Sequence, residues 1–222
     1  GKIEIIKEGM SSVYGQDAAA GVVNFISGPD EKKLVKGSAS FGSGNRQRYT
    51  AGSTYRIFNT DFSLSGMQES GNMLLENSSF FKRNFSGKVA FGEGISMTQL
   101  TGWYFKRDMG VPYNQFGATP NARQSEENFA IGAEQSLDIT AVVLKIKGFT
   151  RSADLGFRDS SVYGDTNARH KKREHQGSLL VIYTEKELLS SITGYEANVK
   201  IADSTSISKK EMANNAVFEN VS

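Results

Sequence analysis

Apolar and polar residues alternate with a period of two along most of the chain after residue 28. The pattern is clear in segments 35–41, 85–91 and 195–201, where apolar or small residues occupy the odd positions and mostly polar residues the even ones. Such alternation places the two sets of side chains on opposite faces of a β-strand. No long window shows the period of an amphipathic helix. The pattern therefore predicts an all-β protein.

The lengths of the connections between these strands carry further information. Short connections at 57–60, 92–95, 136–140 and 184–188 alternate with longer polar ones near 69–80, 107–123 and 154–172, and 42–45 is a short exception. A meander whose short turns all lie at one end is typical of outer-membrane barrels, whereas a soluble sandwich has no reason to sort its hairpins by length. We therefore expect an antiparallel transmembrane β-barrel meander of about ten strands, near 34–41, 46–57, 61–68, 81–91, 96–106, 125–136, 140–152, 173–184 and 188–201, with the tenth beginning near 214.

The composition excludes several kinds of protein. There are no cysteines, which excludes a disulfide scaffold, a thiol nucleophile and a zinc–thiolate site. The net charge of +2 gives no electrostatic case for binding nucleic acid. No apolar run approaches the roughly 18 residues of a membrane helix. If the protein spans a membrane, it must therefore do so as a β-barrel. Only 3 prolines and as many as 23 glycines suit long strands joined by turns.

The first segment, Ile3–Ser27, has a pattern of its own, IEIIKEGMSSVYGQDAAAGVVNFIS. Two β-like ends flank a centre of small residues. The order of its parts is Ile-Glu-Ile-Ile, a basic residue, a glycine turn, Ser-Ser-x-Tyr-Gly, a run of alanines and Gly-Val-Val-Asn-Phe-Ile. This order resembles the end of the plug domain of TonB-dependent outer-membrane receptors. It departs from the family at 7–9, where Arg-Gly-Pro is common, and at 20–21, where Gly-Gly is common.

The resemblance implies two parts of the chain, residues 1–28 as the C-terminal part of a plug domain and residues 29–222 as the N-terminal part of a transmembrane β-barrel. In the family the last plug strand leaves the barrel lumen and runs into the first barrel strand. Glu4 and Lys7 would then lie inside the lumen and form an ionic latch between plug and barrel, since a buried charge needs a partner. The alternative is a solvated pair at a strand end, which contributes little.

The chain is short for a complete receptor of this class. A plugged barrel of this size has about 22 strands. The first part of the plug and the segment that binds TonB have no counterpart in the sequence. An open sheet leaves two unpaired edges, which are unstable in lipid. We therefore expect a fragment that does not transport alone.

The resemblance also implies a function, active uptake of a scarce small molecule across the bacterial outer membrane, driven by the TonB complex, without enzymatic activity or a cofactor. Segment 107–128 is similar to a loop and strand of cobalamin-receptor-like members, so cobalamin or a ferric siderophore is the expected ligand. Carbohydrate uptake is an alternative, because segment 8–26 also resembles carbohydrate-uptake members. The ligand contacts expected from the plug apices and the long loops are Met10, Ser11, Tyr14, Tyr113, Asn114, Gln115, Phe116 and Arg158.

Other residue clusters point to weaker hypotheses. His170 and His175 would lie on opposite faces of one strand, which makes a shared metal site improbable. The basic cluster 169–173 is predicted in an outside loop, where it would contact lipopolysaccharide phosphates or an anionic ligand, or simply be solvated. Outer-membrane lipid is the other expected partner. No nucleophile–base pattern stands out. A passive porin-like or adhesin-like barrel and a soluble carbohydrate-binding sandwich remain the competing readings.

Overall fold

The computed structural model describes residues 2–6, 22–26, 33–72, 74–114, 117–161, 164–185, 189–205 and 207–221. The regular elements of this part are all strands: β1 (Lys2–Ile6), β2 (Val22–Ile26), β3 (Lys33–Gly42), β4 (Arg46–Ile57), β5 (Thr60–Gly71), β6 (Phe80–Glu93), β7 (Ser96–Gly110), β8 (Tyr113–Asn114), β9 (Gly117–Ala118), β10 (Arg123–Ile139), β11 (Val142–Ser161), β12 (Gly164–Glu185), β13 (Leu189–Ser204) and β14 (Ile207–Val221). The described residues contain no helix of the length and hydrophobicity needed to cross a membrane.

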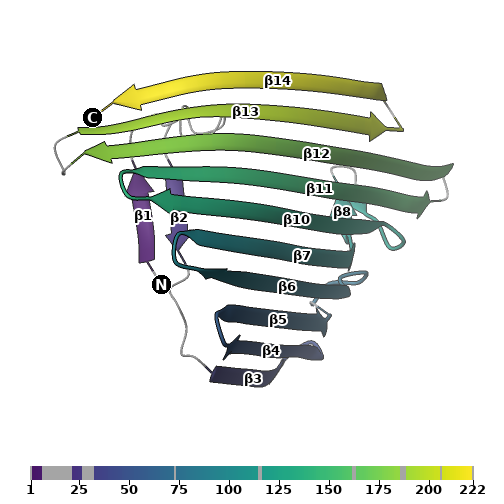
Figure 1. Ribbon diagram of the computed structural model, residues 1–222. Coiled ribbons are helices and arrows are strands. Elements are labelled where there is room, and N and C mark those ends of the chain that lie inside the picture. Colours follow the sequence, from purple (N-terminus) through teal and green to yellow (C-terminus); the bar gives the residue numbers. More distant parts are fainter. Residues whose placement is uncertain are drawn as a thin grey trace.

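Ten strands form one antiparallel sheet in which neighbours along the chain are also neighbours in space (Figure 1). The order runs from β3 through β4, β5, β6, β7, β10, β11, β12 and β13 to β14, so β3 and β14 are its two edges. The small β8–β9 hairpin lies in the connection between β7 and β10. The predicted all-β antiparallel meander is therefore confirmed. The tenth strand begins at Ile207 rather than near 214.

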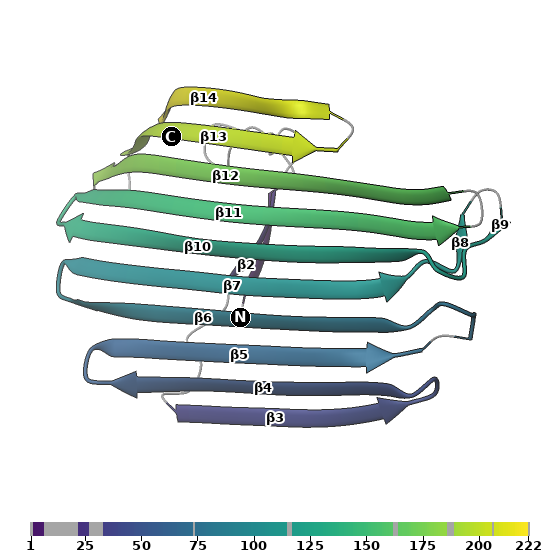
Figure 2. The same cartoon turned by 90° about the vertical axis from the view of Figure 1, so that its right-hand side faces the viewer.

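The first segment forms a separate two-stranded sheet. β1 and β2 are antiparallel, with Ile3 opposite Phe25 and Glu4 opposite Asn24. This hairpin runs across the strand direction of the large sheet in both views (Figures 1 and 2). Lys7 lies outside the described residues. The latch between Glu4 and Lys7, and the division of the chain at residue 28, therefore stay predictions.

One end of the sheet carries only short connections, as predicted: 58–59, 94–95, 140–141 and 186–188. The predicted sorting by length holds only in part, because the opposite end carries short connections too. Phe58, Gly94 and Thr140 have positive φ angles of 49°, 58° and 53°, which tight hairpin turns between twisted strands favour. The other end carries two longer connections, 72–79 and 111–122, beside the shorter 43–45, 162–163 and 205–206.

The predicted long loop at 154–172 is wrong. β11 continues to Ser161 and β12 begins at Gly164, and the two strands pair residue for residue through this region. The cause is a change in which face carries the apolar residues. Near the short turns Leu144 and Ile146 lie on one face, whereas Leu155 and Phe157 farther along lie on the other. A change of phase of this kind looks like the end of a strand in the sequence, although the backbone ladder continues.

The register assigns the side chains of the large sheet to two faces. Residues directly opposite each other on neighbouring strands point to the same side. Phe129 is opposite Tyr104 and Ser152, and we call their side the outer face. Asn128 is opposite Phe105 and Ala153, and we call their side the inner face.

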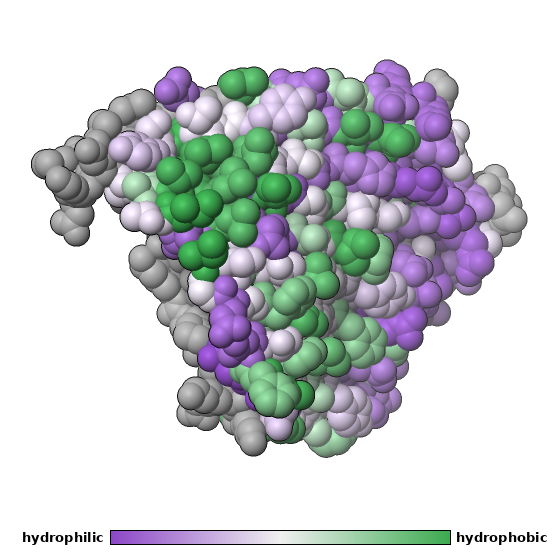
Figure 3. All heavy atoms as spheres, viewed as in Figure 1, coloured by the Kyte–Doolittle hydropathy of each residue, from purple (hydrophilic) through white to green (hydrophobic). Residues whose placement is uncertain are grey.

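The outer face exposes a broad apolar band. In the view of Figure 3 apolar side chains gather toward the short-turn ends of β10–β13 and hydrophilic ones toward the opposite ends. A contiguous apolar surface of this extent is unusual on a soluble monomer, and an outward apolar band is expected where strands face lipid. Exposed members of the band are Tyr55, Phe62, Leu64, Phe85, Leu100, Phe129, Ile131, Ile146, Leu179, Tyr195 and Val217.

The inner face is polar, yet its side chains are less exposed than those of the outer face. Glu69, Asn128 and Asn198 are only 5%, 6% and 9% exposed. A curved sheet crowds the side chains on its concave side, which explains why polar residues there lose contact with solvent. Buried polar groups require partners, and Glu69 accepts a hydrogen bond from Arg46 Nε at 2.8 Å. The chain thus has an apolar outside and a polar, hydrogen-bonded inside.

Asn77 joins the two longer connections at the end opposite the short turns. Its Nδ2 lies 2.8 Å from the carbonyl oxygens of both Thr119 and Ala122. Thr119 and Ala122 are buried. Asn77 has a φ of 53°, in the left-handed region that asparagine tolerates better than most residues. One side chain therefore holds connection 111–122 against connection 72–79.

We expect Asn77→Ala to loosen connection 111–122 in the folded protein. The substitution leaves buried carbonyl groups without their donor, at a cost of about 1–3 kcal/mol. Chymotrypsin cleavage after the exposed Tyr113 should become several-fold faster. Glu76→Ala, at the neighbouring exposed turn position, is the control and should leave the cleavage rate unchanged. Equal rates for the two variants would contradict the role assigned to Asn77.

Candidate functional site

A hollow of about 600 Å³ opens on the inner face, near the end of the sheet remote from the short turns. It lies across β7, β10, β11, β12, β13 and β14. Four of its inner-face side chains are Arg or Lys and one is a carboxylate, so the hollow has a positive lining. The polar members from this face are Arg107, Gln124, Glu126, Asn128, Arg151, His170, Lys172, Ser204 and Lys210.

Arg151 is a half-buried cation of the hollow with no ion pair to another described residue. Its guanidinium carbon lies 5.8 Å from the ring centroid of Trp103 on the same face, a cation–π contact. Its Nε is buried and has no hydrogen-bond partner among the described residues. Glu174 is directly opposite Arg151 in the ladder, but the hydrogen bonds and ion pairs of this carboxylate go to other residues.

The two inner-face carboxylates nearest Arg151, Glu126 and Glu174, have other partners. Glu126 forms an ion pair with Arg107 at 2.8 Å and accepts a hydrogen bond from Asn128 Nδ2 at 2.7 Å. Glu174 lies 3.5 Å from Lys172 Nζ and 3.6 Å from Lys200 Nζ. These contacts neutralise Arg107 and share the charge of Glu174 between two lysines. Arg151 and the exposed Lys210 have no carboxylate partner within the described residues.

The arrangement suits the binding of an anion. A guanidinium offers a planar fork of donors that matches a carboxylate or phosphate. Low exposure around Arg151 strengthens its electrostatic attraction compared with bulk water. The Trp103 ring lies over the guanidinium of Arg151.

Most of the predicted ligand contacts are not tested. Met10, Ser11, Tyr14, Gln115 and Phe116 lie outside the described residues. Tyr113 and Asn114 form the short strand β8 in connection 111–122, and Tyr113 is exposed. None of the predicted contacts that are described lines the inner hollow.

Two predicted positions are corrected. Arg158 is not in a loop but on β11, and the ladder places it on the outer face opposite Arg123 and Asn167. The basic cluster 169–173 is likewise part of β12 rather than a loop. Its side chains alternate, so Arg169 and Lys171 are on the outer face and Lys172 on the inner one. A single basic surface is therefore absent at this position.

The two histidines lie on opposite faces of β12, as predicted. His170 Nδ1 is 2.7 Å from Ser204 Oγ, on the inner face. His175 Nδ1 is 2.9 Å from Thr150 Oγ1, on the outer face. In the described part of the chain, no three His, Cys, Asp or Glu residues come together in a way that holds a metal ion.

Apart from His170 and the basic pair Lys171 and Lys172, which the sequence had singled out, the residues that line the hollow were missed from the sequence. Arg151 and Trp103 are 48 positions apart along the chain, and they meet because both β7 and β11 pair with β10. The available signal was the odd-numbered set of β11, which includes Lys145, Lys147 and Arg151 on one face. Without the register between three strands this signal does not identify a site.

The comparison with known proteins supports this architecture. No protein-family model and no curated protein sequence matches the chain. Solved structures do match its fold. The siderophore receptor PiuA from Acinetobacter baumannii aligns with a TM-score of 0.71 at 13% identity, the copper transporter OprC with 0.78 at 12%, and the ferric-catecholate import receptor Fiu from E. coli K12 with 0.72 at 15%.

These alignments cover 99%, 99% and 90% of the present chain but only 43%, 38% and 39% of the three receptors. The chain thus spans well under half of their length. The matched structures are TonB-dependent receptors. At this identity the likeness concerns the fold, and the predicted resemblance is confirmed at that level. The open ten-stranded meander, with its apolar outer and polar inner face, has the fold of part of the barrel of TonB-dependent outer-membrane receptors.

Proposed function

We propose that this chain is part of the barrel of a TonB-dependent outer-membrane transporter that takes up an anionic ferric siderophore. The observation that carries the proposal is the cationic hollow around Arg151, on the polar face of a sheet whose other face is apolar. In a barrel the polar face lines the lumen. The hollow lies toward the end that carries the two longer connections, where a ligand arriving from outside would enter.

The choice of a ferric siderophore rests on charge and on the matched structures. Ferric complexes with carboxylate or catecholate donors are anionic, and such ligands suit a guanidinium fork. Two of the matched proteins are named as a siderophore receptor and a ferric-catecholate import receptor. Cobalamin, the other ligand expected from the sequence, has no support from these matches, and neither has a carbohydrate.

Transport in this proposal is active and involves no chemical conversion of the ligand. A plug closes the lumen, so ligand release into the periplasm requires work. The TonB complex would supply this work through a segment outside the present sequence. Because the ligand is scarce outside the cell, tight binding at the hollow precedes transport.

The test is uptake of radioactive iron by cells that express the full-length gene product. The expected result is uptake of an anionic ferric siderophore that is lost when TonB is deleted or the proton gradient is collapsed. Uptake that persists in both conditions would show a passive barrel instead. Failure to find the protein in the outer-membrane fraction would reject the proposal altogether.

A further inference from the structure

His170 belongs to a row of inner-face side chains that crosses the sheet at the inner hollow. The ladders place His170 opposite Leu155 on β11 and opposite Ser204 on β13. Leu155 is opposite Glu126 on β10, which is in turn opposite Arg107 on β7. All five side chains line the hollow. The function proposed above gives His170 no role, although it is the titratable member of this row that is closest to neutral pH.

One hydrogen bond holds the imidazole of His170, and this bond is compatible with both charge states of the ring. Nδ1 lies 2.7 Å from Ser204 Oγ. A serine hydroxyl donates to an unprotonated ring nitrogen and accepts from a protonated one. Within the described residues, Nε2 has no hydrogen-bond partner. The second ring nitrogen is therefore available to an anion in the hollow.

No ion pair joins His170 to a carboxylate of the described residues. On the inner face, Glu126 and Glu174 have the cationic partners given above. Asp159 is on the same face but four positions beyond Leu155 along β11, opposite Thr166. A positive charge on the imidazole would therefore act on a ligand rather than on a fixed carboxylate.

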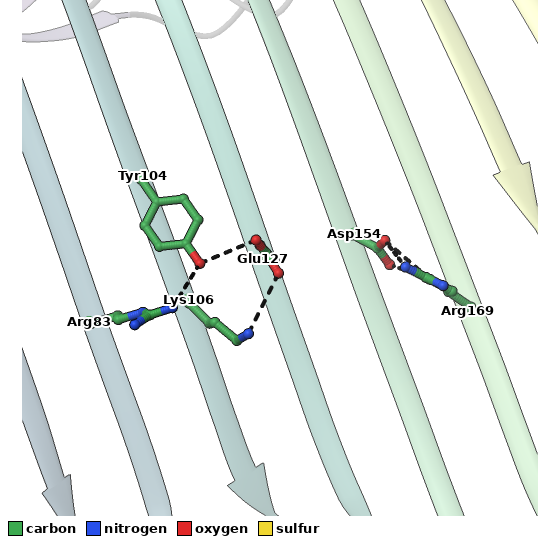
Figure 4. Close-up of polar contacts among 6 residues, drawn as sticks. All are labelled: Arg83, Tyr104, Lys106, Glu127, Asp154 and Arg169. Atoms are coloured by element: carbon green, nitrogen blue, oxygen red, sulfur yellow. Dashed lines mark hydrogen bonds and ion pairs between the residues drawn. The ribbon is translucent and has the colours of Figure 1, made fainter.

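The other cations near His170 differ in the face on which they lie. Lys172, two residues farther along β12, and Lys210, on β14, share the inner face with His170. Arg169 directly precedes His170 but lies on the outer face, and its Nε donates to Asp154 Oδ1 at 2.9 Å (Figure 4). Protonation of His170 would thus add one charge to the inner cations alone.

Protonation of a histidine and binding of an anion beside it strengthen each other. The anion stabilises the charged imidazolium, and by thermodynamic reciprocity the imidazolium strengthens binding of the anion by the same factor. We propose that His170 takes up a proton from water when the anionic ligand binds in the inner hollow, with Nδ1 donating to Ser204 Oγ and Nε2 donating to the ligand. The hollow then binds its ligand more tightly in acidic surroundings. The inference deepens the proposed function and rests on it.

The test uses the full-length receptor in detergent and hexacyanocobaltate(III), an inert trianion. Ferric siderophores are less suitable because their own donor groups titrate, whereas the charge of this probe stays constant between about pH 5 and pH 8, where histidine changes charge. His170 is exposed, so solvent screens part of the attraction. We expect calorimetry to show about three- to tenfold tighter binding near pH 5 than near pH 8. Near the middle of this range, two buffers with different heats of ionisation should reveal proton uptake on binding.

Two histidine variants assign the effect to one residue. His170→Gln should bind the trianion at both pH values about as the unchanged receptor does near the alkaline limit, and the proton uptake should be lost. His175→Gln is the matched control. His175 lies on the same strand but on the outer face, where its Nδ1 is 2.9 Å from Thr150 Oγ1. This variant should keep both the pH dependence and the proton uptake.

Several results would overturn the inference. Affinity that does not change with pH, or no binding of the trianion at either pH, would exclude the coupling. Proton uptake that persists in His170→Gln, or is lost equally in both variants, would assign it to other groups. An unboiled gel that separates folded from unfolded barrels checks each variant, and His170→Asn replaces His170→Gln if the latter does not fold. The pH dependence and proton uptake of the unchanged receptor need no variant.

Iron uptake by cells separates this inference from the proposed function. TonB-dependent uptake together with anion binding that is independent of pH would reject only the role of His170. Proton-coupled anion binding without TonB-dependent uptake would reject only the transport proposal.

Discussion

Leu100→Arg should prevent most of the protein from assembling in the outer membrane. Leu100 lies near the middle of the apolar stretch of β7, is 45% exposed and has Val89 and Ala133 as its neighbours on the outer face. An arginine on the lipid face near the bilayer midplane costs about 2–4 kcal/mol. That cost is comparable with a large part of the stability of a typical domain. The measurement is the fraction of folded barrel recovered from outer membranes.

The control is Gln99→Arg, at the preceding residue of the same strand. Gln99 is on the inner face opposite Glu134, so an added arginine meets a polar surface and a carboxylate. We expect normal assembly for this variant. The contrast between the two adjacent positions tests which face meets lipid. Equal recovery of both variants, or a greater loss with Gln99→Arg, would show that the faces are assigned the wrong way round or that the sheet does not lie in a bilayer.

The meander could be predicted from the sequence because one physical demand repeats in every strand: side chains on the outer face are apolar where the strand crosses the apolar band. Each strand crosses the same apolar band, and the segments 35–41, 85–91 and 195–201 show period two. Beyond the band that demand disappears. Residues 153–158 carry leucine and phenylalanine inward and charges outward, which reverses the phase. The strand ends were therefore misjudged where the apolar band ends and the pattern is no longer imposed.

Predicting the candidate site required the register between neighbouring strands, which the alternating pattern does not provide. The opposite orientation of His170 and His175 follows from their spacing alone and was predicted correctly. The contact between Arg151 and Trp103 depends on the register of β10 against both of its neighbours. A shift of one residue in either pairing would move one of the two side chains to the outer face. The two-residue turn between β10 and β11 fixes one of these registers, but the long connection 111–122 does not fix the register of β10 against β7, so the hollow could not be found from the sequence.

Arg151→Gln should weaken binding of an anionic ferric siderophore roughly 10- to 100-fold. The loss corresponds to about 1.5–3 kcal/mol for hydrogen bonds that involve a charged group. Arg151→Lys keeps the charge but loses the planar fork and much of the stacking on Trp103. The affinity of this variant should therefore lie between that of the unchanged protein and that of Arg151→Gln. The measurement is the concentration of ligand that half-saturates binding to whole cells. Lys145→Gln removes a charge from the same strand and the same face outside the hollow, and should bind normally.

The same variants distinguish ligand binding from a structural role for Arg151. If this guanidinium instead pairs with an acidic group of a plug, Arg151→Gln would lower the thermal stability of the assembled receptor and leave the affinity unchanged. If it binds the ligand, the affinity falls while the stability of the ligand-free receptor stays the same or rises, because an uncompensated charge of low exposure has been removed. A neutral siderophore gives a further comparison. Its affinity should be insensitive to Arg151→Gln, since the proposed contribution depends on the negative charge of the ligand.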